Sequence, residues 1–475
     1  MPNQDNQISF NNKKRSLIKW MLYILPLVIG LVYWLAFFPG VMSYDSLYQW
    51  DQLSTLKISS WHPAIHTILM WILTRIWYSP AIVSLFQVVF ASIIIGYGLN
   101  SILAASSLPA YLFVALGILM AGNPLVGIID ITLWKDIIYS FLVLLLTIII
   151  FNILSTKGQW INKPIHFILL GCTAAFICLF RYNGFPIAVT SLVCLLLIYI
   201  KNYKPFIYSS LIFLSVTFLV LGPLYTIFKV DREYRQPFSI ALLNPVVAYV
   251  SADKDLSILS SAEKSYLNSI YPLDAPWPYS CYDATIFFYQ QTNLHPLIDD
   301  SLSLIRIISK LAIKDPLPLI HHFACLSSFV WQPNQPRNVY LETILLDTYN
   351  PAQTPAWLVY SDVVIQKPLL PQINHFIQRL VQAEWHRDTA MLLWRPALYM
   401  YAFMLGLILY VVRSRNSKWL ILSVPLLTQS MVLMFTAQLQ AVRYQYPVYL
   451  ISMLFTIPLV IVGIKYQHPF SIQVQ

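Results

Sequence analysis

Apolar residues fall into eleven long runs, separated by short polar or charged stretches. Most runs approach the roughly 20 residues that an α-helix needs to cross the hydrocarbon core of a bilayer. They occupy residues 16–38, 64–79, 80–104, 109–128, 137–154, 164–180, 186–200, 206–228, 392–412, 419–437 and 446–464. Helices satisfy their own backbone polar groups in lipid, so this pattern predicts an all-α integral membrane protein.

Basic residues at the ends of the runs indicate their orientation. They cluster at 13–19, 157–163, 201–204, 413–418 and 465. Under the positive-inside rule, these ends and both termini are cytoplasmic, whereas residues 39–61 and 134–136 are extracytoplasmic. Two cytoplasmic termini require an even number of crossings. We therefore expect about ten spans, with one of 64–79, 80–104 or 109–128 short, re-entrant or broken.

The segment 229–391 contains no spanning run and carries 15 of the 20 acidic residues. It predicts an α-rich extracytoplasmic segment between an N-terminal transmembrane module, 1–228, and C-terminal transmembrane helices, 392–475. Its stretch 301–314 has helical spacing of Leu and Ile with basic residues between them. That pattern fits a helix lying on the membrane and fits packing inside a domain equally well.

Composition supports the membrane assignment, since 58% of the residues are apolar and only 11% are charged. The net charge of +10 comes mostly from Lys and Arg beside apolar runs, so it indicates topology and no nucleic-acid partner. The first run lacks a small-residue cleavage site and is expected to remain as a span. Cys281 and Cys325 lie in the wet segment, where they either pair in an oxidising compartment or stay separate buried thiols.

The first outer loop contains the first candidate chemistry, around the sequence SYDSLYQW. Ser43 is placed to cap a helix that begins at Tyr44. On that helix Asp45, Gln49 and Gln52 share one face. Asp45 is either a functional carboxylate held close to the membrane plane or an ordinary solvated acid on a connector.

Two histidines follow in the same loop. His62 precedes Pro63, and His66 lies one turn further along the next predicted helix, on the same face. The pair could share a divalent metal ion with Asp45, or the imidazoles could hydrogen-bond to backbone and water.

A second candidate is the sequence LWKD, where Lys135 and Asp136 interrupt an apolar passage at the predicted outer boundary. Ionisable groups near hydrocarbon are costly and are usually functional. The alternative is an interfacial anchor with a snorkelling lysine. Asp130, in the same stretch, is an acid of comparable rank.

Two arginines stand at predicted outer ends of spans, against the charge rule. They are Arg181 in RYNG and Arg443 in QAVRYQYP, where Tyr444 follows. Arginine binds phosphate with two parallel hydrogen bonds, and anchoring to lipid headgroups is the competing explanation.

These residues together match glycosyl transfer from a lipid phosphate. The acceptor hydroxyl needs a base, for which we expect Asp45, and the departing phosphate needs positive charge, for which we expect Arg443. Asp136 is the expected second acid. Further substrate contacts are expected from Arg181, Lys135, His62, Gln49 and Tyr444.

The motifs PGVMSYDSLYQW, WHP, LWKD, RYNG and RYQYP resemble the GT-C superfamily of polytopic membrane glycosyltransferases. That superfamily includes the protein O-mannosyltransferases and the bacterial aminoarabinose transferases. The resemblance covers most of the front half and the last spans, and it looks closest to a bacterial branch whose substrates are mostly undefined. Ser46 follows Asp45 where better-defined members carry a second acid, so metal dependence stays open.

The resemblance implies a polyprenyl-phosphate-linked sugar as donor and inverting transfer on the outer face of the inner (plasma) membrane. The acceptor would be a glycan, a lipid or a protein. Three alternatives remain at this point: a transporter or flippase, a polymerase or ligase of cell-envelope glycans, and a structural scaffold. Charges near the bilayer midplane would favour the transporter.

Overall fold

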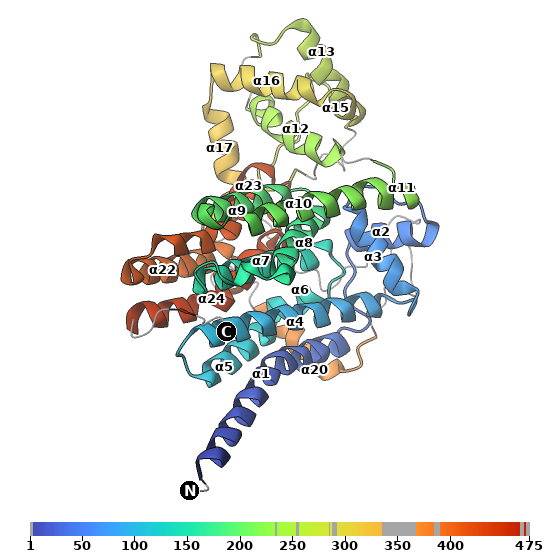
Figure 1. Ribbon diagram of the computed structural model, residues 1–475. Helices are drawn as coiled ribbons and strands as arrows, with labels where there is room; N and C mark the ends of the chain where they lie inside the picture. The colour runs from blue at the N-terminus through green and yellow to red at the C-terminus, as the bar shows by residue number, and fades with distance from the viewer. Residues whose placement is uncertain are drawn as a thin grey trace.

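A computed structural model describes residues 3–232, 235–252, 256–284, 286, 292–334, 367–383, 390–465 and 470–471. The regular secondary structure of these described residues is entirely helical, with isolated bridges and no extended strand. Figure 1 shows most helices packed in one bundle, with a smaller group of helices projecting from one side. The all-α prediction is confirmed for the described residues.

Seven helices among the described residues are long and apolar enough to cross a membrane. They are Ser16–Ala36 of α1 (Asn3–Ala36), α4 (Pro80–Ala105), α7 (Lys135–Ser155), Lys204–Ile227 across α10 (Lys204–Leu219) and α11 (Tyr225–Ile227), α22 (Pro396–Ser414), Ser417–Thr436 including α23 (Val424–Thr436), and Val442–Lys465 including α24 (Tyr446–Lys465). These features mark the chain as an α-helical membrane protein.

The remaining apolar runs form shorter or bent helices. The helices α5 (Ala110–Gly122) and α6 (Pro124–Ile131) meet at a bend of 59° and could form an eighth, broken span. The helix α3 (Ala64–Thr74) has 11 residues, about 16 Å at 1.5 Å per residue and well short of the ~30 Å hydrocarbon core. The expected short or broken helix within 64–128 is therefore found twice, as the short α3 and as the bent pair α5 and α6. Ten spans stay a prediction, because α8 (Pro164–Phe180) and α9 (Gly184–Ile198) are also short.

The helix α7 forms the centre of the bundle. Its span is 94% buried, and it packs against α4, α8 and α24. A helix that is apolar on every side has no face suited to water and is normally enclosed by other helices. The first turn of α7, which carries Lys135 and Asp136, is consequently held firmly by the surrounding bundle.

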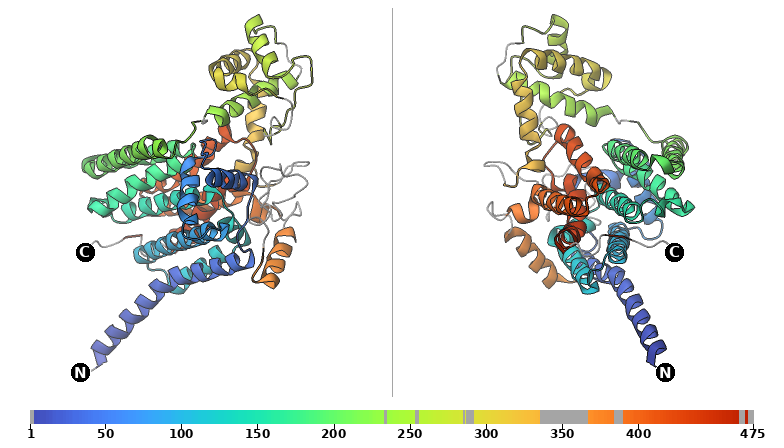
Figure 2. Two further views of the ribbon diagram at one scale, coloured as in Figure 1. Left: turned by 90° about the vertical axis from the view of Figure 1, so that its right-hand side faces the viewer. Right: turned by 60° about the vertical axis from the view of Figure 1, so that its left-hand side comes forward.

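The cap unit is the projecting group of helices from residue 235 to residue 326. It consists of α12 (Arg235–Ser251), α13 (Ser261–Ile270), α15 (His295–Asp299), α16 (Ser301–Lys314) and α17 (Leu317–Leu326). Figure 2 shows it at one corner of the bundle in both further views. Its core is separate from the bundle core, and α17 returns to the bundle at α23.

The stretch 301–314 packs inside the cap unit. Leu304, Ile307 and Leu311 are buried in its core, and Lys310 Nζ lies 2.8 Å from Glu263 Oε1 on α13. Of the two explanations for its amphipathic pattern, the structure favours domain packing.

The rest of the predicted segment 229–391 contributes α18 (Ser328–Trp331), α20 (Pro371–Ala383) and α21 (Ala390–Trp394). Residues 335–366 lie outside the described residues. A disulfide joins Cys281 to Cys325, with their Cα atoms 5.9 Å apart. The paired alternative for these cysteines is therefore the one observed. The domain boundaries at 228 and 391 stay predictions.

Candidate active site

Two segments distant in sequence run side by side at the base of the site. The Val41 amide donates to the Ile131 carbonyl at 3.1 Å, and the Leu133 amide donates to the Val41 carbonyl at 2.9 Å. Gly40 permits this approach, because its φ is +122° and a Cβ there would lie 3.1 Å from the Ile131 oxygen. The pairing places the first turn of α2 (Tyr44–Thr55) beside the first turn of α7.

Two serine hydroxyls fix the start of α2. The Ser43 hydroxyl accepts from the Ser46 amide and so caps the helix, and it also accepts from Trp134 Nε1 at 2.6 Å. The Ser46 hydroxyl donates to the Leu133 carbonyl at 2.8 Å. Asp45 is therefore held in a first helical turn, where the helix dipole favours a negative charge.

The sequence RYNG forms the tight connection between α8 and α9. Arg181 ends α8, its carbonyl accepts from the Gly184 amide at 2.9 Å, and its Nε donates to Asn183 Oδ1 at 3.1 Å. A Cβ at Gly184 would collide with the Ile177 carbonyl oxygen. Glycine is thus required for the turn that aims Arg181 back at α7.

Arg443 sits in the short turn Val442–Gln445 that leads into α24. The preceding residues pair with two parts of the chain that the disulfide joins. The Ala284 amide donates to the Gln438 carbonyl at 2.6 Å, and Gln440 Nε2 donates to the Cys325 carbonyl at 3.0 Å. The disulfide region therefore holds the segment that presents Arg443.

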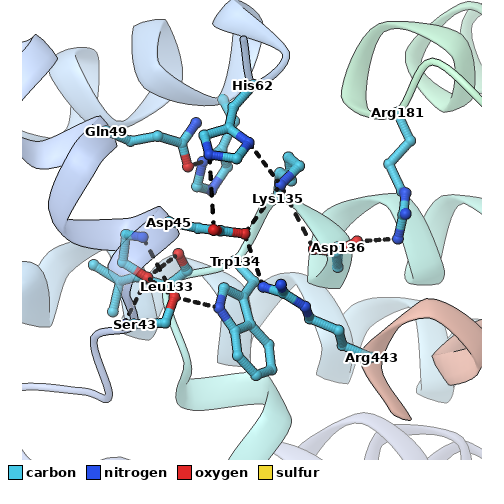
Figure 3. A network of polar contacts seen from close by, with 12 residues as sticks. Ser43, Asp45, Gln49, His62, Leu133, Trp134, Lys135, Asp136, Arg181 and Arg443 are labelled. Atoms are coloured by element: carbon cyan, nitrogen blue, oxygen red, sulfur yellow. Dashed lines mark hydrogen bonds and ion pairs between the residues drawn. The ribbon is translucent and has the colours of Figure 1, made fainter. Parts of the chain in front are cut away.

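Asp45 is the centre of a charge network (Figure 3). Arg443 Nη1 donates to its Oδ2 at 2.9 Å, and Lys135 Nζ lies 3.5 Å from the same oxygen. His62 Nε2 lies 3.8 Å from Oδ1. The Asp45 side chain is 26% exposed, whereas that of Arg443 is only 9% exposed. The Asp45 carboxylate is thus accessible to solvent, whereas the Arg443 side chain is largely buried.

Asp136 extends the network toward α8. Arg181 Nη1 donates to Asp136 Oδ1, and Lys135 Nζ lies 4.0 Å from Asp136 Oδ2. The Asp136 side chain is 1% exposed. Because it is buried and already paired with Arg181, Asp136 is better suited to orienting the cations than to transferring protons.

Aromatic rings support both arginines. The Arg443 guanidinium lies 4.7 Å from the Trp134 ring centroid and 5.3 Å from that of Tyr444. The Arg181 guanidinium lies 4.6 Å from the same Tyr444 ring. Such cation–π contacts stabilise a guanidinium without neutralising it, so Tyr444 sets the spacing of the two cations.

Positive side chains outnumber negative ones among the described residues of the network. Burial by itself raises the pKa of the Asp45 carboxyl. Arg443, His62 and Lys135 together outweigh that effect and hold the pKa well below its usual range. Burial and the Lys135 ammonium lower the pKa of His62 to about 3, so the ring is neutral at pH 7. Among the described residues of this network, two carboxylates then face three cations.

The tautomer of His62 follows from its neighbours. Lys135 Nζ lies 3.2 Å from His62 Nδ1, and because an ammonium can only donate, Nδ1 accepts. The ring proton is then on Nε2, the atom that faces Asp45 Oδ1. A pocket of about 280 Å³ adjoins both residues and is otherwise lined by Tyr44, Tyr48 and Trp61.

Gln49 and His66 lie behind this network. Gln49 is 1% exposed. Its Nε2 donates to Thr67 at 3.1 Å, and its Oε1 lies 3.0 Å from His66 Nδ1. Both polar atoms of its amide are therefore used to hold α2 against α3, and Gln49 does not reach the pocket as a substrate-binding residue would. Asp45 and Gln49 both lie on α2, and α3 covers the part of the helix that carries Gln49.

Asp130 is separate from the network as well. It is 7% exposed, and its Oδ1 accepts from the Tyr446 hydroxyl at 2.7 Å. The described residues contain no group of three or more His, Cys, Asp or Glu side chains placed to hold a metal. Around Asp45, the nearest positive charge comes from Lys135 and Arg443.

Sequence reasoning missed Trp134 and the capping Ser43 as parts of the site. Trp134 combines a hydrogen bond to Ser43 with the contact to Arg443. Its position directly before Lys135 was the available signal, although a tryptophan at a membrane boundary is ordinarily interpreted as an interfacial anchor.

Comparisons of the chain with protein-family models, with curated proteins and with solved structures found no match. The resemblance to the GT-C superfamily therefore stays a prediction that rests on the motifs alone.

Proposed function

We propose that the protein is a glycosyltransferase that moves a sugar from a polyprenyl-phosphate donor to an acceptor on the extracytoplasmic face, with inversion. The observation that carries the proposal is the contact of Asp45 with Arg443 and Lys135. It places a partly exposed carboxylate directly beside two cations. A base and a phosphate-binding group are what this reaction needs side by side.

The reaction can be written for these residues. The acceptor hydroxyl oxygen bonds to the anomeric carbon while the bond from that carbon to the phosphate oxygen breaks. The electron pair of the broken bond stays on the phosphate, where Arg443 and Lys135 offset the added charge. Asp45 accepts the hydroxyl proton.

Arg443 has a second effect on this step. Its ion pair keeps Asp45 ionised but makes the carboxylate a weak base. When a donor phosphate competes for the guanidinium, the pKa of Asp45 rises toward its ordinary value. The base thus becomes stronger only once the donor is bound.

The location of the charges disfavours a transporter. A transporter would hold its substrate near the middle of its spans. Here Asp45, Lys135 and Asp136 lie in first helical turns. Arg181 directly follows α8, and Arg443 lies in the turn Val442–Gln445 that leads into α24.

The test is release of polyprenyl phosphate by the full-length protein in lipid nanodiscs, using a panel of synthetic polyprenyl-phosphate hexoses and pentoses as donors and a cell-envelope extract as the source of the acceptor. Asp45→Asn keeps the shape of the side chain and removes the base, so we expect a loss of about 10²- to 10⁴-fold. Asp51→Asn removes an equal charge from the same helix and should retain activity. Normal release by Asp45→Asn at equal abundance would refute the assignment.

A further inference from the structure

The two carboxylate oxygens of Asp45 have different surroundings. Oδ2 is engaged by Arg443 at 2.9 Å and by Lys135 at 3.5 Å. Among the described residues, Oδ1 lies 3.8 Å from His62 Nε2, which is beyond hydrogen-bonding distance. His62 and Asp45 line the pocket, whereas Arg443 and Lys135 are not among its lining residues. Oδ1 is therefore the oxygen on the pocket side.

The rest of the pocket lining is aromatic. Tyr44 is 45% exposed, and Tyr48 and Trp61 are half-buried. The Tyr48 ring packs edge-on against His62, with ring centroids 5.8 Å apart. Aromatic faces carry negative charge density and attract weakly positive C–H groups. One face of a sugar ring presents such C–H groups, while its hydroxyls need partners such as a carboxylate and an imidazole N–H.

The pocket is also fixed on its outer side. Trp61 packs against the core of the cap unit. The adjacent Ser60 amide donates to the Asp231 carbonyl at 2.7 Å, and the Asp231 amide donates to the Ile58 carbonyl at 2.8 Å. The aromatic wall is thus tied to the start of the chain segment that builds the cap unit, which gives it a defined position relative to Asp45.

We propose that this pocket binds one sugar ring of a carbohydrate acceptor, with a ring hydroxyl directed at Asp45 Oδ1. Its volume of about 280 Å³ is just below the ~300–1,000 Å³ of drug-sized ligand sites, so it suits a single sugar ring and no larger ligand. The proposal rests on the proposed function for the role of Asp45, and it selects a glycan from among the glycan, lipid and protein acceptors.

The experiment measures binding of methyl glycosides of glucose, galactose and mannose by saturation-transfer-difference NMR, without any donor. The full-length protein is placed in lipid nanodiscs, because common detergents carry sugar headgroups. We expect transfer to the ring C–H protons of at least one glycoside. Tyr44→Ala should weaken binding about tenfold, equivalent to 1.4 kcal/mol, whereas Tyr78→Ala should not, although Tyr78 is 62% exposed.

Three further variants make the result decisive. Trp61→Phe keeps an aromatic face and should keep binding, while Trp61→Leu should lose it. Arg443→Lys should weaken binding of the donor and leave glycoside binding unchanged. The absence of a signal from every glycoside, or equal losses in Tyr44→Ala and Tyr78→Ala, would overturn the acceptor site. Donor cleavage that persists in that case would leave the proposed function intact.

Discussion

The ion pair between Asp45 and Arg443 should contribute measurably to stability, and a double-mutant cycle can isolate its contribution. Breaking a buried ion pair by removing one partner costs about 3–5 kcal/mol. The cost here should be smaller, since Asp45 is 26% exposed and keeps Lys135 at 3.5 Å. We therefore expect a coupling energy of about 1–3 kcal/mol between Asp45→Asn and Arg443→Gln.

The assay is the free energy of unfolding in mixed micelles, titrated with sodium dodecyl sulfate and followed by circular dichroism. A matched cycle of Glu263→Gln and Lys310→Gln tests a pair whose lysine side chain is 40% exposed, for which we expect less than about 1 kcal/mol. Additivity of the Asp45 and Arg443 variants within about 0.5 kcal/mol would refute the reasoning.

The pH dependence gives an independent check on the same pair. The pKa of Asp45 is lowered in the folded protein, whereas an unfolded aspartate titrates near pH 4. The stabilisation is therefore fully present above about pH 4 and is lost as the pH falls through the lowered folded-state pKa. The coupling energy should be constant from about pH 8 to pH 5. A decline within that window would mean that Asp45 is not held ionised.

Two further predictions concern the elements that position the arginines. Removing the disulfide with Cys281→Ser and Cys325→Ser should lower the free energy of unfolding by up to about 4 kcal/mol, given the 44-residue separation. It should also reduce donor cleavage. Unchanged cleavage would show that Arg443 is positioned without the disulfide. Gly184→Ala should cost about 1–3 kcal/mol through its collision with the end of α8, while Gly222→Ala, which meets no atom within 4 Å, should be close to neutral in the same unfolding assay.

Hydrophobic patterning predicted the helices well, because in lipid each helix is specified largely by its own sequence. The run 80–104 became Pro80–Ala105, and the run 137–154 became the span Lys135–Ser155. Patterning located the irregular region 64–128 but not its form. The bend between α5 and α6 depends on Pro124 and on Asn123, whose side chain caps α6, and apolar composition alone does not report such features.

The members of the charge network could be selected from sequence because each is costly near hydrocarbon. Their contacts with one another could not be predicted from the sequence. Asp45 and Arg443 are 398 residues apart, and no local pattern encodes that pairing. Gln49 also shows that contacts are not encoded locally. Helical spacing places it on the face of Asp45, but the hydrogen bonds of its amide go to Thr67 and His66 on α3.

Positive and negative side chains alternate across the site, and this order bears both on stability and on the proposed function. From Arg443 through Asp45, Lys135 and Asp136 to Arg181, positive and negative groups alternate, so each carboxylate lies between two cations and none of the five is isolated. Among the described residues, this alternating row begins and ends with a cation, so it holds one more positive than negative side chain. Under the proposed function, a singly charged phosphodiester donor would offset that charge on binding. The proposal therefore implies that the site gives up part of the stability of the ligand-free protein in order to recognise the donor.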